Sequence, residues 1–132
     1  MIICKSPAEI EKLRRSGGMV REILNETRER VKPGVTTWDL EVFVEKRLAQ
    51  LGARPAFKGY RGYPCCLCAS VNQEVVHGIP SGRRRLAEGD IVSLDLGVIL
   101  DGYYGDSALT VPVGEISEPL RKLLRVTVES LE

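Results

Sequence analysis

The sequence contains a single histidine, His77, and no apolar run that approaches the roughly 20 residues needed for a membrane-spanning helix. Its first residues lack a basic segment followed by an apolar one, so we expect no secretory signal. The formal net charge is only +1, which argues against a surface that binds polyanions. The one basic run, Arg83 to Arg85, is interpreted as a solvated loop. We therefore expect a cytoplasmic protein with no membrane partner and no specific nucleic-acid binding.

Cysteine is scarce and poorly placed for a disulfide framework, because Cys65, Cys66 and Cys68 are crowded together and only Cys4 lies elsewhere. Cys65 and Cys68 form a C-x-x-C motif, but a zinc ribbon needs a second such pair. A redox dithiol would be followed by a helix, and the residues after this motif favour a strand. We interpret these cysteines as small buried hydrophobic residues of a reduced protein.

The length and composition of the chain are sufficient for one folded domain. A chain of 132 residues with ordinary hydrophobic and charged content predicts a single domain, residues 1–132, with a buried core. Three segments combine a capping residue with a helical spacing of apolar residues: 7–31 after Ser6, 37–51 after Thr36 and before Gly52, and 118–131 after Ser117. Gly17 and Gly18 weaken the first helix and predict that another backbone approaches it closely there.

The chain is organised around residues 90–110, where two β-rich runs flank Asp101-Gly102, a strong hairpin signal. A two-residue turn places Gly97 opposite Asp106, and Asp95 on the same face as a diagonal neighbour. Two carboxylates this close can hold a pair of divalent cations. The other face of the first strand is apolar and should pack on a core: Val92, Leu94, Leu96, Val98 and Leu100.

Most hairpins of this kind are solvated edges whose aspartates face water. What favours a ligand site here is Gly97, which removes bulk opposite Asp106. His77 ends a second predicted pair of strands, 67–71 and 74–77, beside glycine and proline, where functional side chains often project, although a lone histidine is more often structural. Residues 53–64, rich in glycine, proline and aromatic residues, are interpreted as a loop or an irregular strand.

Two long segments resemble methionine aminopeptidases of the short bacterial type (type I). GYRGYPCCLCASVNQEVVHGIP is similar to the substrate-pocket and histidine motif of that family, and GDIVSLDLGVILDGYYGDSALT is similar to its metal-binding hairpin. The opening EIEKLRRSGGMV and the turn VKPGVTTWDLE also fit. The resemblance implies an α+β fold, the N-terminal half of the pita-bread (creatinase/aminopeptidase) fold, with an antiparallel sheet and helices on one face.

By this resemblance the protein would be a methionyl aminopeptidase, a metalloexopeptidase that removes N-terminal methionine from nascent proteins. Asp95 and Asp106 would be ligands shared by two divalent metal ions (Co, Mn, Fe or Zn), and a hydroxide bridging the ions would attack the first peptide bond. His77 would donate a hydrogen bond near the scissile amide. The methionine pocket would be formed by aromatic and thiol side chains, Phe57, Tyr60, Tyr63 and Cys68.

In that family the second half supplies a histidine and two glutamates to the metals, and nothing in this sequence matches them. We therefore expect a fragment of a longer protein, or a truncated relative, that binds metal weakly and does not turn over by itself. The full-length protein is expected to be a monomer, with association with the ribosome as a further expectation. Two alternatives stay open: a non-catalytic half that acts as a binding module, and a relative of X-Pro dipeptidase or aminopeptidase P, which share the fold and the metal pair.

Overall fold

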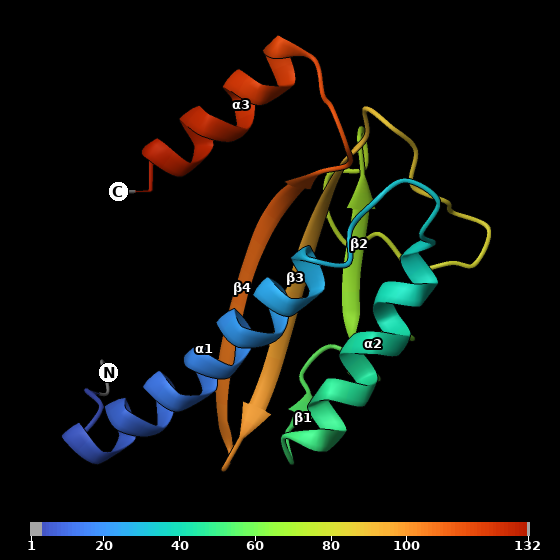
Figure 1. Cartoon of the computed structure of the whole chain (residues 1–132). Helices are drawn as coiled ribbons and strands as arrows, with labels where there is room; N and C mark the ends of the chain where they lie inside the picture. Colours follow the sequence, from blue (N-terminus) through green and yellow to red (C-terminus); the bar gives the residue numbers. More distant parts are fainter. Residues whose placement is uncertain (1–3, 132) are drawn as a thin grey trace.

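The computed structural model describes residues 4–131, which form three α-helices, four strands and one 3₁₀ turn (Figure 1). The helices are α1 (Pro7–Arg28), α2 (Thr37–Gln50) and α3 (Glu118–Glu129). The strands are β1 (Arg54–Pro55), β2 (Leu67–Val71), β3 (Ile91–Leu100) and β4 (Tyr103–Pro112), and the 3₁₀ turn spans Tyr60–Gly62.

The four strands form one antiparallel sheet with β3 at its centre. β4 pairs along one side of β3, while β1 and β2 pair with different stretches of the other side. The predicted register of the hairpin is confirmed, since Gly97 pairs with Asp106. Asp101 and Gly102 both have positive φ, 50° and 81°, as a type I′ turn requires. Asp95 and Asp106 therefore share the face of the sheet that we call the open face.

Helices α1 and α2 cover the opposite face (Figure 1). The apolar side chains of β3 are buried beneath them, with 0% exposure: Val92, Leu94, Leu96 and Val98. The two helices contribute the other side of this core: Val20, Ile23, Leu24, Leu40, Val44 and Leu48. Each such side chain contributes about 1.5–3 kcal/mol when it is fully buried. The core thus holds one face of the hairpin fixed and leaves the face with the aspartates uncovered by these helices.

Both covering helices begin at the predicted caps. Ser6 Oγ accepts a hydrogen bond from the Glu9 backbone N–H (3.3 Å), and the Glu9 carboxylate accepts one from the Ser6 backbone N–H (2.8 Å). Thr36 and Asp39 repeat this capping box at α2. The predicted extent of the first helix was too long, because α1 ends at Arg28. Beyond it the N–H groups of Arg30 and Val31 donate to the carbonyls of Thr27 and Arg28, three residues back, and so form tight turns in place of an α-helix.

The backbone approach predicted for Gly17-Gly18 is present, but the glycine that permits it is Gly105 of β4. A Cβ atom on Gly105 would lie 2.6 Å from the backbone carbonyl of Ser16 and 2.7 Å from the backbone nitrogen of Gly17. A Cβ atom on Gly17 or Gly18 would meet nothing within 4 Å. Helix α1 therefore packs directly on the backbone of β4 because β4 lacks a side chain at this point.

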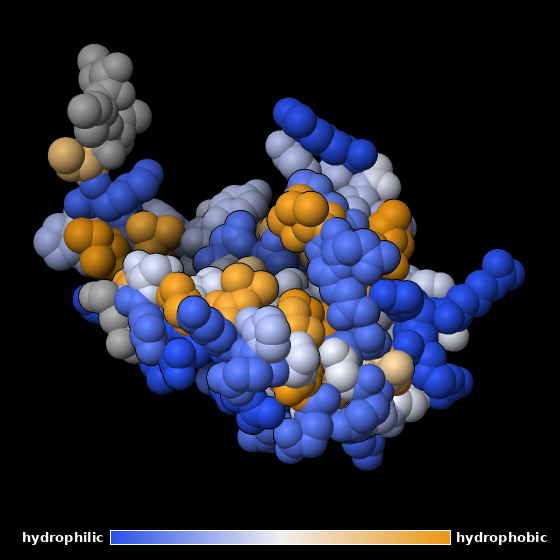
Figure 2. Space-filling view, turned by 90° about the horizontal axis from the view of Figure 1, so that it is seen from above, coloured by the Kyte–Doolittle hydropathy of each residue, from blue (hydrophilic) through white to orange (hydrophobic). Residues whose placement is uncertain are grey.

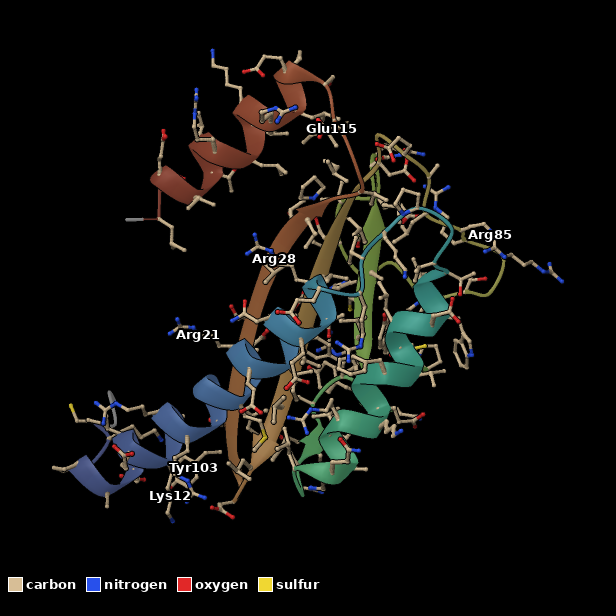
Figure 3. The ribbon with its side chains drawn as sticks, viewed as in Figure 1. Lys12, Arg21, Arg28, Arg85, Tyr103 and Glu115 are labelled. Atoms are coloured by element: carbon tan, nitrogen blue, oxygen red, sulfur yellow. The ribbon has the colours of Figure 1, made fainter. Side chains whose placement is uncertain are left out.

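Helix α3 stands apart from this core and buries none of its residues (Figure 1). Between α3 and the open face runs an apolar groove, the α3 groove, lined by Val75, Val76, Leu123, Leu124 and Val128 among others. Arg28 extends from the end of α1 toward α3 at the margin of this groove (Figure 3). Seen from above, apolar side chains lie exposed among the polar ones at this end of the molecule (Figure 2). No helix among residues 4–131 is long and apolar enough to cross a membrane.

Candidate functional site

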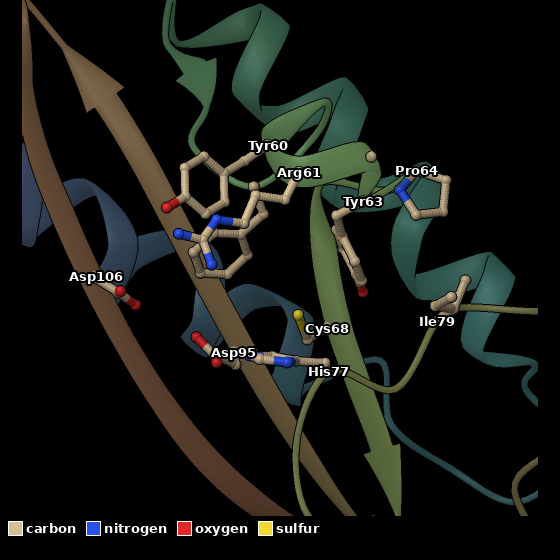
Figure 4. A pocket seen from close by; sticks show the side chains of 11 residues that line it. Tyr60, Arg61, Tyr63, Pro64, Cys68, His77, Ile79, Asp95 and Asp106 are labelled. Carbon is tan, nitrogen blue, oxygen red and sulfur yellow. The ribbon is translucent and has the colours of Figure 1, made fainter.

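The open face contains a pocket of about 540 Å³ beside the 3₁₀ turn. Its lining includes every residue that the sequence singled out for a site: Phe57, Tyr60, Tyr63, Cys68, His77, Asp95 and Asp106. Arg61, Gly62, Pro64 and Ile79 complete the lining (Figure 4). Side chains from β2, β3, β4 and two loops thus meet in one place.

Asp95 of β3 and Asp106 of β4 form the acidic part of the pocket, with their carboxylates pointing toward one another (Figure 4). Burial raises the pKa of Asp95, and the neighbouring Asp106 carboxylate raises it further, while His77 opposes the shift. Asp95 Oδ1 is buried and has no hydrogen-bond partner among residues 4–131. A buried carboxylate oxygen without a partner is unfavourable, and a cation would satisfy it.

The donor set therefore fits a divalent cation, because hard carboxylate oxygens are the ligands that such ions accept. It does not complete the coordination, since no group of three or more His, Cys, Asp and Glu side chains among the described residues could hold a metal ion. The described residues therefore offer a pair of carboxylates to a metal ion and not a complete set of side-chain ligands.

His77 reaches the pocket from a loop, and the predicted strand over residues 74–77 is wrong. His77 has a left-handed backbone, with φ of 60°, which a strand does not tolerate. The next residue is tied to β2: the Ala69 N–H donates to the Gly78 carbonyl (2.9 Å), and the Gly78 N–H donates to Ser70 Oγ (3.0 Å). The imidazole of His77 points toward Asp95 (Figure 4).

Gly78 is required for this arrangement. A Cβ atom at this position would lie 2.4 Å from the Ala69 carbonyl oxygen, well inside van der Waals contact. The glycine therefore lets the loop lie against β2, and this contact sets the position of the histidine.

Tyr63 fixes the wall next to the histidine. Its hydroxyl lies 2.9 Å from the Leu67 carbonyl oxygen and 3.1 Å from the Gly78 carbonyl oxygen, and donates its proton between them. Burial raises the pKa of Tyr63, so the phenol stays neutral. Because its hydroxyl is hydrogen-bonded to these backbone carbonyls, only the ring of Tyr63 lines the pocket.

Cys68 lies on β2 with its thiol in the pocket (Figure 4). Burial raises the pKa of this thiol above its usual value, and the nearby aspartates add to the shift. The thiol therefore remains protonated and behaves as a small polarisable hydrophobe. Cys65 and Cys66 are buried and free as well, which agrees with the interpretation of the cysteines as buried hydrophobic residues.

Gly97 was expected to leave space for a ligand opposite Asp106, and the structure shows that Phe57 occupies this space. The space opposite Asp106 is filled, because a Cβ atom on Gly97 would lie 2.5 Å from Phe57 Cε1 and 2.8 Å from Ala56 Cβ. The missing side chain of Gly97 thus makes room for the aromatic ring that lines the pocket, and not directly for a ligand.

Glu41 is a residue of this region that the sequence analysis missed. It lies on α2 with only 2% exposure, and its carboxylate accepts hydrogen bonds from the backbone N–H groups of Cys66 (2.7 Å) and Leu67 (2.9 Å). These bonds anchor the start of β2, which carries Cys68. The signal was its place at the helical spacing of Thr37, Val44 and Leu48, which puts a carboxylate on the buried side of α2.

Comparison with known proteins identifies the family of this chain. The chain matches the model of metallopeptidase family M24 over residues 11–132, and it belongs to this family. Its antiparallel sheet with helices on one face is half of the pita-bread fold of that family.

Within the family, the similarity is to methionine aminopeptidases. The chain is 52% identical to that of Clostridium acetobutylicum over 98% of its own length, and 50% identical to methionine aminopeptidase 1 of Bacillus subtilis over 99%. The crystal structure of methionine aminopeptidase from Thermotoga maritima matches with a TM-score of 0.94 at 48% identity, covering 98% of this chain. In each case the chain covers 52% of the other protein. It therefore spans about half the length of the curated relatives it matches.

Proposed function

We propose that this chain carries half of the active site of a metal-dependent methionyl aminopeptidase, which removes N-terminal methionine from nascent proteins in the cytoplasm. The observation that supports this most directly is the unpaired, buried Asp95 Oδ1 beside Asp106 in a pocket with an aromatic and thiol wall. An acidic pair next to an apolar wall suits a ligand with a metal-directed amine and amide at one end and an apolar side chain at the other.

Asp95 and Asp106 would hold two divalent ions between them, Co, Mn, Fe or Zn. When bound, the ions would supply Lewis acidity that polarises the scissile carbonyl and lowers the pKa of water. His77 is the residue that we assign to catalysis among the protein's own groups. Its ring points toward Asp95 from the loop (Figure 4), where it would donate a hydrogen bond near the scissile amide and stabilise the tetrahedral intermediate.

The methionine side chain would lie against the remaining wall, formed by Phe57, Tyr60, Tyr63 and Cys68. A thioether packs favourably against aromatic edges and other sulfur atoms. The neutral thiol of Cys68 and the hydrogen-bonded phenol of Tyr63 support this role, because neither carries a charge that would favour a polar substrate side chain.

We further propose that residues 1–132 form one domain, the N-terminal half of the catalytic unit, and that the remaining metal ligands come from another polypeptide segment. The α3 groove supplies the exposed apolar surface on which such a segment would pack. The complete protein would be a monomer and would meet its substrates at the ribosome, where N-terminal methionine is first exposed.

The test uses the release of methionine from Met-Ala-Ser. The chain by itself, supplied with Co²⁺ or Mn²⁺, should bind metal weakly and release none. A chimera should be active when residues 1–132 are joined to the half of the C. acetobutylicum enzyme that the alignment does not cover. Asp95→Asn or Asp106→Asn in the chimera should lower the rate by at least about 100-fold, whereas Asp101→Asn in the hairpin turn should not.

Each outcome decides a different point. Robust turnover by the chain alone would contradict the need for further ligands. A folded chimera that binds metal but releases no methionine would favour a non-catalytic binding module. Release of alanine from Ala-Pro in preference to methionine from Met-Ala would assign the site to the X-Pro class.

A further inference from the structure

Arg61 is a cation in the pocket to which the proposed reaction assigns no role. Within residues 4–131 it is the only lysine or arginine that lines the pocket. Its backbone is left-handed, with φ of 48°, because it lies in the tight 3₁₀ turn between Gly59 and Gly62. Its side chain extends past Tyr60 toward the side of the pocket on which the two aspartates lie (Figure 4).

The charge of Arg61 is not neutralised within the described part of the chain. Its guanidinium forms no ion pair among residues 4–131, with Asp95 and Asp106 included. The guanidinium forms a cation–π contact with the ring of Tyr60, whose centroid lies 5.4 Å from the guanidinium carbon. That contact steadies the group while leaving its N–H donors available. Tyr60 is itself 65% exposed, so Arg61 lies at the rim of the pocket.

We propose that Arg61 binds a carboxylate of the substrate peptide beyond the first peptide bond. This inference rests on the proposed function, because it takes the orientation of the peptide from it. With the methionine side chain against the aromatic wall and the first peptide bond at the aspartates, the rest of the peptide leaves over the rim. A guanidinium presents several N–H donors in a planar array that matches a carboxylate. The carboxylate can be an acidic side chain or the terminal carboxylate of a short peptide.

The experiment measures binding and does not depend on turnover. The chain, labelled with ¹⁵N and kept in EDTA, is titrated with four peptides and followed by NMR. Met-Ala-Asn-amide is the reference, Met-Ala-Asp-amide adds a side-chain carboxylate, Met-Ala-Asn with a free C-terminus adds a terminal one, and Gly-Ala-Asn-amide removes the methionine. We expect about two- to fivefold tighter binding of a carboxylate peptide than of the reference, the size of an exposed ion pair.

Three variants test whether Arg61 is the cause. Arg61→Gln should abolish the preference for carboxylate, and Arg61→Lys should keep part of it. Arg83→Gln, which removes another exposed arginine from a loop outside the pocket, should leave the preference unchanged. Because the interaction is at the surface, the preference should shrink at 0.5 M salt, where screening acts over roughly 4 Å. A preference in either carboxylate arm supports the proposal and identifies the source.

The outcomes separate this inference from the proposed function. If Met-Ala-Asn-amide binds more tightly than Gly-Ala-Asn-amide but neither carboxylate improves binding, Arg61 has no such role and the methionine site stands. A preference that survives in Arg61→Gln also overturns the inference. If methionine gives no advantage over glycine, or if no peptide binds, the methionine pocket proposed for this chain is contradicted and this inference fails with it.

Discussion

At the residue scale, His77 depends on the glycine that follows it. Gly78 lies against the Ala69 carbonyl so closely that only hydrogen fits there. The hydrogen bonds of its N–H and carbonyl to β2 then set the left-handed turn at His77. The sequence pointed to His77 through its neighbours, glycine and proline. It could not show this conformation, which follows from a contact with a strand several residues earlier in the chain.

Replacing Gly78 by alanine tests this contact. Gly78→Ala should lower the free energy of unfolding by about 2 kcal/mol or more, because the methyl group overlaps backbone atoms that cannot move away easily. Gly82→Ala is the matched control, since a Cβ atom there would meet nothing within 4 Å, and it should be nearly neutral. Urea unfolding of both variants measures the difference. Equal stability of the two would contradict the packing described for Gly78.

Asp95 carries a second prediction at this scale. Its pKa is raised in the folded state, mainly by burial, so the folded protein binds this proton more tightly than the unfolded chain does. The corresponding contribution to stability is therefore present at low pH and is lost as the pH rises from the unfolded pKa of about 4 through the raised folded value. At neutral pH the wild-type protein contains a poorly solvated carboxylate with one unpaired oxygen.

Asp95→Asn should accordingly stabilise the protein in EDTA at pH 7, by about 1 kcal/mol, because a neutral amide is less costly to bury than an unpaired carboxylate. The gain should shrink as the pH falls toward 4. Asp101→Asn, which removes only the exposed ion pair with Arg15, should change stability by less than about 1 kcal/mol at any of these pH values. Thermal unfolding across the pH range measures this, and a destabilised Asp95→Asn variant at pH 7 would contradict it.

At the scale of the elements, the sequence was sufficient for the parts fixed by local chemistry. The hairpin, its register and its turn follow from the Asp-Gly pair and from the two-residue alternation of apolar side chains in β3. The two covering helices follow from Ser6, Thr36 and their capping partners. The failures arose where tertiary contacts decide: the strand expected at residues 74–77 is a loop tied to β2, and the space at Gly97 belongs to Phe57.

Two glycine-to-alanine substitutions at the contact of α1 with β4 should change the stability of the protein in opposite directions. Gly105→Ala should destabilise the protein by about 2–3 kcal/mol, because the added methyl group meets the backbone of Ser16 and Gly17. Gly18→Ala should stabilise it by about 0.5–1 kcal/mol, because the site is open and alanine favours a helix more than glycine does. Denaturant unfolding measures both. A destabilising Gly18→Ala would show that the glycine pair itself is needed for the contact.

At the scale of the whole molecule, the chain has two unequal faces. One face of the sheet is closed by α1 and α2 over a continuous core. The other bears the acidic pair and the pocket, and the α3 groove adjoins it with exposed valines and leucines, among them Val75 at 86% and Leu131 at 90%. Asp95 and Asp106 share this open face, as the pattern of alternation in β3 and β4 predicted. The sequence alone could not place Arg61 or Glu41, whose positions depend on the turn and on the packing of α2.

The most direct test of the account is where a divalent ion binds to this chain. Mn²⁺ added in substoichiometric amounts to the ¹⁵N-labelled protein broadens the amide signals of residues close to the bound ion. The account predicts early and selective broadening at Asp95, Asp106 and His77, and its loss in Asp95→Asn. Broadening that begins elsewhere, such as at the exposed glutamates of α3, or that is unchanged by Asp95→Asn, would contradict it.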